Sequence, residues 1–200
     1  MPTGREILEQ TWRSLSGRWM PLLIALWAAF ICQGVLGSLP KVGWLAGLLI
    51  SGPFYVGVSA FVLRLMRDGD RDWETLLQGF ENLGRNAVAF FLLLFWIVLG
   101  TLLLIVPGVL WMLSYSQTFF ILAEEPGISA TDALKRSKEM MRGHRMELVI
   151  LHLWQFGLFL LSPFTLFIGL IWLIPYCYAC WARFYEALKK LPTVSTAPAA

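Results

Sequence analysis

The sequence predicts an all-α protein, a polytopic membrane helical bundle in which six transmembrane helices form three hairpins. Of its 200 residues, 58% are hydrophobic and only 14% are charged, whereas a soluble domain has about 25% charged residues. Apolar stretches close to the roughly 20 residues that cross a hydrocarbon core recur along the chain. A charged amphipathic segment precedes the first, third and fifth of them. These observations favour three hairpins, each preceded by an amphipathic helix on the cytoplasmic side.

The amphipathic helices are predicted at residues 1–18, 73–83 and 129–143. Thr3 with Glu6, and Ser129 with Asp132, have the spacing of a capping box, in which the first side chain accepts a backbone hydrogen bond at the helix start. Glycine adopts the left-handed conformation that ends many helices. The stops are therefore predicted at Gly17, Gly84 and Gly143.

The apolar stretches between these helices are the predicted spans. The fourth and fifth are shorter than the usual length, so they would tilt little, lie where the bilayer thins, or have half-buried ends. Turns are predicted at residues 40–42, 107–108 and 162–163. The six spans are residues 19–39, 43–63, 87–106, 109–123, 146–161 and 164–181.

An internal repeat relates the three units. Each predicted stop glycine is followed within two residues by an arginine, namely Arg18, Arg85 or Arg145. Recurring signals at such a period indicate a repeat architecture, although any six-span protein has turns and glycines at similar intervals. We therefore predict a single integral membrane domain at residues 1–190 with pseudo-repeats at about 1–66, 67–125 and 126–190, followed by a disordered tail at 191–200.

The distribution of charge predicts the topology. Of sixteen basic residues, only Lys41 would lie on the outer side of three outward hairpins. Because basic residues concentrate on the cytoplasmic side, both termini are predicted to be cytoplasmic.

The third amphipathic helix has the densest basic cluster. Its apolar face would pack on the bilayer or the bundle, which leaves the basic side chains at the level of the lipid headgroups. Each basic residue near an anionic surface contributes roughly 1 kcal/mol of attraction. These side chains would hold anionic phospholipids or an acidic partner segment; alternatively, they only set the topology. The residues are Lys135, Arg136, Lys138, Arg142 and Arg145.

Polar side chains within the spans form a second candidate site, an intramembrane cluster of Gln117, His152 and Gln155. Polar groups at membrane depth usually face the bundle or a water-filled cavity. The cluster is therefore either a set of interhelical hydrogen bonds or part of a path for a substrate or an ion.

Proline predicts helix kinks at Pro53 and Pro175, where a neighbouring tyrosine such as Tyr176 can satisfy the freed carbonyl. Cys177 and Cys180 form a C-x-x-C pair within one apolar helix, so small packing residues are favoured over metal or redox chemistry. The sequence has neither an H-E-x-x-H zinc helix nor a G-x-S-x-G nucleophile elbow. No catalytic residue, metal site or cofactor is predicted.

The second half of the chain carries an ordered set of motifs from Pro107 to Leu188: Pro107-Gly108, Tyr115-Ser116, Leu122-Ala123, Pro126, Ala133-Leu134, Ser137, Met140-Met141, Gly143, Gly157, Pro175-Tyr176 and Phe184-Tyr185-Glu186. This order resembles the bacterial integral membrane family catalogued as domain of unknown function 975. The resemblance implies a multi-pass bacterial inner-membrane protein related to the membrane portion of some glycerophosphodiester phosphodiesterases. It implies no catalytic residue, because that activity belongs to a separate soluble domain.

Together these features favour a non-catalytic interaction protein or lipid-associated accessory protein. Its partners would be the lipid bilayer, in particular anionic phospholipids, and another membrane protein, but no nucleic acid. The alternative is a transporter or channel for a small or amphiphilic solute. A membrane enzyme that metabolises lipids is the least favoured class.

Overall fold

The computed structural model describes residues 3–38, 43–103, 105–162 and 169–191, and within these ranges every regular element is a helix. The helices and their bounds are α1 (Gly4–Ser14), α2 (Trp19–Gly37), α3 (Gly43–Arg67), the 3₁₀-helix η1 (Trp73–Leu77), α4 (Gln78–Glu81), α5 (Leu83–Leu103), α6 (Ile105–Tyr115), α7 (Thr118–Glu124), α8 (Ala130–Met140), α9 (Arg145–Leu160) and α10 (Leu170–Lys189). The prediction of an all-α protein is therefore confirmed for the described residues. The predicted turn at 40–42 and nearly all of the predicted tail lie outside them.

The first and third amphipathic helices begin at the predicted caps, and each ends three residues before its predicted stop glycine. Thr3 and Glu6 form both hydrogen bonds of the capping box at the start of α1. Ser129 accepts from the Asp132 backbone N–H at the start of α8. Past these helices, Gly17 and Gly143 have φ angles of 78° and 85°, so the left-handed stop is confirmed at both places.

The second amphipathic segment differs from the prediction. It is a 3₁₀-helix followed by a single α-helical turn, and Asn82 is the residue at which α4 ends. Gly84 lies inside the first turn of α5, so the predicted stop at Gly84 is wrong. Because Asn82 already leaves the helical conformation, with φ −118° and ψ 52°, no left-handed glycine is needed two residues later.

The predicted fourth span is also interrupted. Residues 109–123 belong to two helices, α6 and α7, which are separated by Ser116 and Gln117. Pro107 and Gly108 lie in the first turn of α6 rather than in a turn before it.

Among the residues that the structure describes, three helices are long and apolar enough to cross a membrane, at Trp19–Gly37, Ala46–Arg67 and Leu83–Leu102. Within the described residues, α6 and α9 have only 11 and 16 residues. The chain therefore has helices that fit a membrane protein, while six spans in three hairpins stay a prediction.

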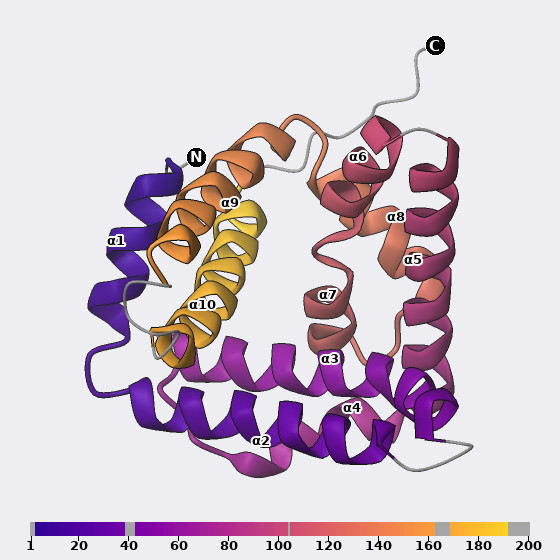
Figure 1. Cartoon of the computed structure of the whole chain (residues 1–200), viewed down its shortest axis with the longest axis horizontal. Coiled ribbons are helices and arrows are strands. Elements are labelled where there is room, and N and C mark those ends of the chain that lie inside the picture. Colours follow the sequence, from indigo (N-terminus) through magenta and orange to yellow (C-terminus); the bar gives the residue numbers. More distant parts are fainter. Residues whose placement is uncertain (1–2, 39–42, 104, 163–168, 192–200) are drawn as a thin grey trace.

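Figure 1 shows α2 and α3 side by side along one edge, with α1, α9 and α10 gathered at one end of this pair and α5 to α8 at the other. Each amphipathic segment packs on helices of a different predicted unit. Helix α1 packs on α9 and α10, η1 and α4 pack on α3, and α8 packs on α5, α6 and α7. Because α1 packs on α10, the first and the last of the described helices are in contact. The pseudo-repeats themselves stay a prediction.

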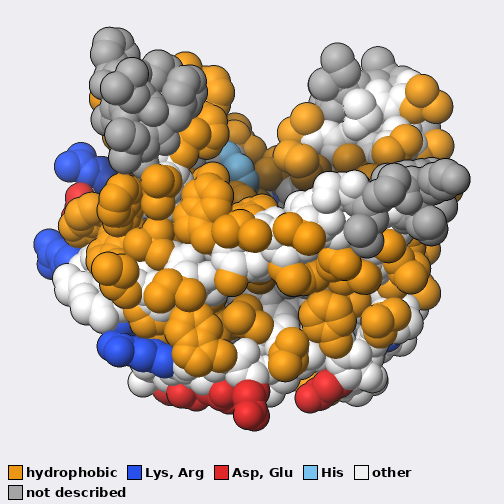
Figure 2. Space-filling model, turned by 60° about the horizontal axis from the view of Figure 1, so that its bottom comes forward, with side chains coloured by type: hydrophobic (Ala, Val, Ile, Leu, Met, Phe, Trp, Pro, Cys, Tyr) orange, Lys and Arg blue, Asp and Glu red, His pale blue; other side chains and the backbone are white. Residues whose placement is uncertain are grey.

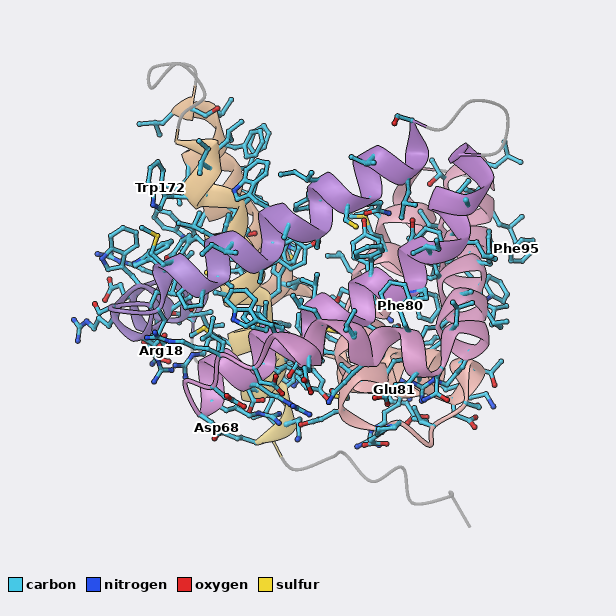
Figure 3. All side chains as sticks on the ribbon, turned by 90° about the horizontal axis from the view of Figure 1, so that it is seen from below. Arg18, Asp68, Phe80, Glu81, Phe95 and Trp172 are labelled. Carbon is cyan, nitrogen blue, oxygen red and sulfur yellow. The ribbon has the colours of Figure 1, made fainter. Side chains whose placement is uncertain are left out.

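The outer surface is largely apolar. Figure 2 shows hydrophobic side chains over the broad middle of one face, with acidic side chains along its lower edge and basic ones at its side. In Figure 3, Arg18, Asp68 and Glu81 lie toward one end, whereas Trp172 lies toward the other and Phe95 points outward. The large exposed side chains include Met20, Ile24, Ile31 and Val35 of α2, Val88, Phe91, Phe95 and Val98 of α5, and Ile150, Leu153 and Trp154 of α9.

Candidate functional site

The basic residues around α8 differ in how far they are neutralised. Arg136 donates to the Glu125 carboxylate at 2.6 Å, and Lys135 pairs with Asp132 at 3.4 Å. Lys138 and Arg142 are exposed and make no ion pair with any described residue. Arg145 is half-buried, and its Nε is a buried donor that has no partner in the described part of the chain.

The opposite face of α8 is fixed to the interruption between α6 and α7. Ala133, Leu134 and Ser137 are buried there. The Ser137 hydroxyl donates to the Ser114 carbonyl at 2.9 Å and accepts from the Gln117 backbone N–H at 3.2 Å. A helix break leaves backbone groups without helical partners, so Ser137 satisfies one group on each side of this break.

The three residues of the predicted polar cluster have different partners. Gln117 is buried and donates from its side chain to Ser116, but its Oε1 has no partner among the described residues. Gln155 accepts from the Trp181 ring N–H at 3.2 Å, and His152 stacks on the same ring with centroids 5.7 Å apart. The His152 Nδ1 also contacts the Leu148 carbonyl of its own helix at 2.8 Å. That the three side chains face one another stays a prediction.

The two prolines lie inside continuous helices, Pro53 in α3 and Pro175 in α10. The Tyr176 hydroxyl donates to the Leu8 carbonyl at 2.8 Å and so ties α10 to α1. Cys177 is half-buried and Cys180 is buried. The described residues contain no group of three His, Cys, Asp or Glu side chains that would hold a metal ion.

A network of charged groups joins the ends of three helices. Arg67 of α3 pairs with Glu124 of α7 and with Glu186 of α10. Glu124 also accepts from the Tyr185 hydroxyl at 2.6 Å and from Lys189 at 2.7 Å. We call these five residues the charged end. Burial alone would raise the pKa of the Glu124 carboxyl, but the hydrogen bonds from Lys189, Tyr185 and Arg67 outweigh it and lower that pKa from its ordinary value of 4.5.

Two arginines at the starts of long helices bind the carbonyls that end other helices. Arg18 donates to the Leu65 carbonyl at 2.9 Å and to the Met66 carbonyl at 3.4 Å, near the end of α3. Arg85 donates to four carbonyls at or just past the end of α7, those of Leu122, Glu125, Pro126 and Ile128. Cations stabilise the carbonyl end of a helix. The sequence signal for this role was the arginine that recurs after each predicted stop.

Comparison with known proteins identifies one family. The model of the family described as "Protein of unknown function (DUF975)" matches residues 81–192. No curated protein and no solved structure matches the chain. The match covers more than half of the chain, and it includes α8, the break between α6 and α7, and the ends of α7 and α10.

Proposed function

The chain belongs to the DUF975 family, whose function is unknown, and we propose that it is a multi-pass inner-membrane accessory protein without catalytic chemistry. In this proposal both termini are cytoplasmic, and the exposed face of α8 binds anionic phospholipid headgroups. The site residues are Lys138 and Arg142, with Lys135, Arg136 and Arg145 in support.

The observation that carries the proposal is the arrangement of α8. One face of the helix is buried against α6 and α7 through Ser137, while Lys138 and Arg142 stand exposed on the other face without a counter-ion in the described chain. A cation that no carboxylate neutralises remains available to a lipid phosphate. Two such cations contribute roughly 2 kcal/mol of attraction to an anionic leaflet, less at higher salt.

The charged end supports the proposed topology. The ends of α3, α7 and α10 meet there through Arg67, Glu124 and Glu186, and the start of α2 is beside the end of α3 through Arg18. If these ends lie at the cytoplasmic surface, the C-terminus is cytoplasmic as well. A C-terminal fusion to a reporter that is active only in the cytoplasm should then be active. Activity of a reporter that works only in the periplasm would contradict the topology.

The lipid proposal is tested by reversing the two free cations. We expect Lys138→Glu/Arg142→Glu to lose most of the anionic lipid that co-purifies with the protein in mild detergent, measured by lipid mass spectrometry. The matched control is Arg5→Glu, which reverses an exposed arginine on α1 that pairs with Glu9. It should retain its lipid.

Unchanged lipid content in the double variant, with the C-terminal reporter still cytoplasmic, would leave the basic residues with no role beyond orientation. Lost lipid together with an altered reporter signal would mean that the variant is inserted differently, and that result also counts against the proposal.

One observation favours a second candidate, a transporter or channel. Interrupted helices with polar side chains at the break are typical of transport sites. Gln117 lies at such a break, and its buried Oε1 has no partner among the described residues. After replacement of the native cysteines, Gln117→Cys should react with a membrane-impermeant thiol reagent if water reaches this point. Protection of this cysteine would favour the accessory protein.

A further inference from the structure

A pocket of about 420 Å³ lies where the ends of α1, α3 and α10 meet the start of α2. This volume falls within the roughly 300–1,000 Å³ of small-ligand sites. Four cationic side chains, one carboxylate, one serine and one methionine line it: Arg18, Arg67, Arg183, Lys190, Glu186, Ser14 and Met66. None of them is on α8.

The four cations differ in how many ion pairs and hydrogen bonds they already make. Arg67 pairs with Glu124 and Glu186, so its charge is balanced. Arg18 donates to two backbone carbonyls, which occupy part of its guanidinium without cancelling its charge. Arg183 makes no ion pair with any described residue, and its Nε is buried without a hydrogen-bond partner there. Lys190, exposed just past the end of α10, likewise has no counter-ion in the described chain.

The pocket therefore has a surplus of positive charge, because Arg183 and Lys190 have no counter-ion among the described residues. The two Nη groups of an arginine match the oxygens of a phosphate, to which they donate two parallel hydrogen bonds. A carboxylate ligand would suit the fork too, but three cations without a carboxylate partner in the described chain fit the higher charge and the additional oxygens of a phosphate.

Two lining residues, Ser14 and Arg18, lie close in sequence to aromatic residues that are typical of a membrane interface. Trp12 and Trp19, on either side of Ser14 and Arg18, stack edge-on with centroids 5.2 Å apart, and Trp12 is 60% exposed. Exposed tryptophans of this kind lie at the headgroup level. A phospholipid headgroup could enter here from the bilayer, and a soluble phosphate could enter from the aqueous side.

We propose that Arg183, Lys190 and Arg18 form a phosphate-binding pocket at the meeting point of α1, α3 and α10. Arg183 supplies the fork, Lys190 a mobile point charge, and Arg18 the remaining guanidinium donors. The inference is independent of the lipid site proposed on α8, because the two sites share no residue.

The test measures binding of two probes to the purified full-length protein in uncharged detergent micelles by isothermal calorimetry. The probes are inorganic phosphate and a water-soluble short-chain phosphatidic acid. We expect Arg183→Gln to weaken binding by about tenfold or more, since a hydrogen bond to a charged group is lost. Arg183→Lys keeps the charge but not the fork, so it should recover only part of the affinity.

Lys190→Gln provides a second variant that is safe for folding, because Lys190 is exposed and lies beyond the last helical residue. It should weaken binding by a smaller factor. Lys138→Glu/Arg142→Glu is the background for the phosphatidic acid measurements, because it removes the lipid site proposed on α8. The matched control is Arg5→Gln, at an exposed arginine of α1 that pairs with Glu9 outside the pocket, and it should bind the probes as its parent does.

The two probes distinguish the source of the phosphate. Binding of both probes, weakened equally in Arg183→Gln, assigns the pocket to the phosphate group itself. Binding of phosphatidic acid alone assigns it to a lipid headgroup, and binding of phosphate alone to a soluble compound. Absence of binding by either probe, or affinities unchanged in both Arg183→Gln and Lys190→Gln, would overturn the proposal. A loss of binding in Arg5→Gln alone would overturn it as well.

Discussion

Helix α3 is continuous near Pro53, whereas the chain near Ser114 is interrupted between α6 and α7. In both places a neighbouring helix contacts the backbone. Pro53 cannot donate a backbone hydrogen bond, yet α3 continues without interruption from Gly43 to Arg67. The segment around Ser114 has no proline, yet it breaks after Tyr115. Proline content therefore does not decide which of the two helices is interrupted.

What differs is the group that faces the backbone in each place. Gly79 of α4 lies so close to α3 that a Cβ built on it would be 2.0 Å from the Pro53 carbonyl oxygen and 2.7 Å from the Gly57 nitrogen. At the other place, the Ser137 hydroxyl bonds to the Ser114 carbonyl and to the Gln117 N–H. Where α3 is continuous, the neighbouring helix α4 packs on it through the backbone of a glycine. Where α6 and α7 are separated, the neighbouring helix α8 supplies a hydroxyl that both donates and accepts, and this stabilises the break.

The largest expected effect comes from filling the close contact. Gly79→Ala should lower the free energy of unfolding in micelles by about 3 kcal/mol, because the new methyl group overlaps the backbone of α3 and the two helices must separate. The matched control is Gly84→Ala, since Gly84 lies in a helix and a Cβ there meets nothing within 4 Å.

Gly84→Ala should stabilise the protein by roughly 0.5–1 kcal/mol, the gain of alanine over glycine inside a helix. If Gly84→Ala destabilised the protein instead, Gly84 would need the left-handed conformation of a helix stop. If Gly79→Ala were neutral, α4 would not approach α3 as closely as described.

The next effect concerns the charged end, where α3 and α7 meet. Glu124→Gln should cost about 2 kcal/mol, because a neutral amide cannot replace the charge-assisted hydrogen bonds to Arg67, Tyr185 and Lys189. The control is Glu139→Gln, an exposed carboxylate of α8 without an ion pair in the described chain.

The pH dependence of the same variant has a definite sign. Since folding lowers the pKa of Glu124, its contribution to stability is fully present above the ordinary value of 4.5 and is lost as the pH falls through the lowered pKa. The difference in unfolding free energy between wild type and Glu124→Gln should therefore shrink in acid. A difference that does not change down to pH 3 would show that the ion pairs contribute nothing.

A smaller effect is expected at the helix break. Ser137→Ala removes both hydrogen bonds of the hydroxyl and leaves two backbone groups of the junction unsatisfied, so we expect a loss of about 1–2 kcal/mol. Hydrogen exchange of the Gln117 amide should accelerate at the same time, since that N–H loses its partner. Ser16→Ala, at an exposed serine past the end of α1, should change neither quantity; equal exchange rates in the two variants would mean that Ser137 does not protect the junction.

The contrast between the two places also explains what the sequence could predict. Thr3, Glu6 and Ser129 cap helices through contacts within three residues, so their spacing alone predicts the bonds. The left-handed glycines at Gly17 and Gly143 are equally local. Gly84 had the same local signal, but Asn82 ends the preceding turn first.

Long-range contacts were beyond the reach of local patterns. The break at Gln117 depends on Ser137, twenty residues away, and the charged end joins Arg67 to Glu186. The pocket near Arg183 needs α1 to pack on α10, a contact between opposite ends of the sequence. Hydropathy predicts which residues are apolar, but it does not predict which of the helices meet.

The smallest change in the free energy of unfolding is expected at α10, the second helix that contains a proline. Its Trp181 ring N–H donates to Gln155 of α9, whose Nε2 is buried and without a partner in the described chain. Gln155→Leu removes this bond, but it also removes the unsatisfied Nε2, so the two consequences oppose each other. We expect a net loss below about 0.6 kcal/mol, the typical value of an interhelical hydrogen bond in a membrane.

A double-mutant cycle with Trp181→Phe isolates the bond, because phenylalanine keeps a ring against His152 but lacks the N–H donor. The coupling free energy of Gln155→Leu and Trp181→Phe should be near the same 0.6 kcal/mol. A coupling of zero would mean that the Trp181 N–H does not fix the Gln155 side chain. Gln155 would then be free to serve the polar path of the second candidate function, and the α9–α10 contact would depend on apolar packing and the Trp181–His152 stack, as the α3–α4 contact depends on bare backbone.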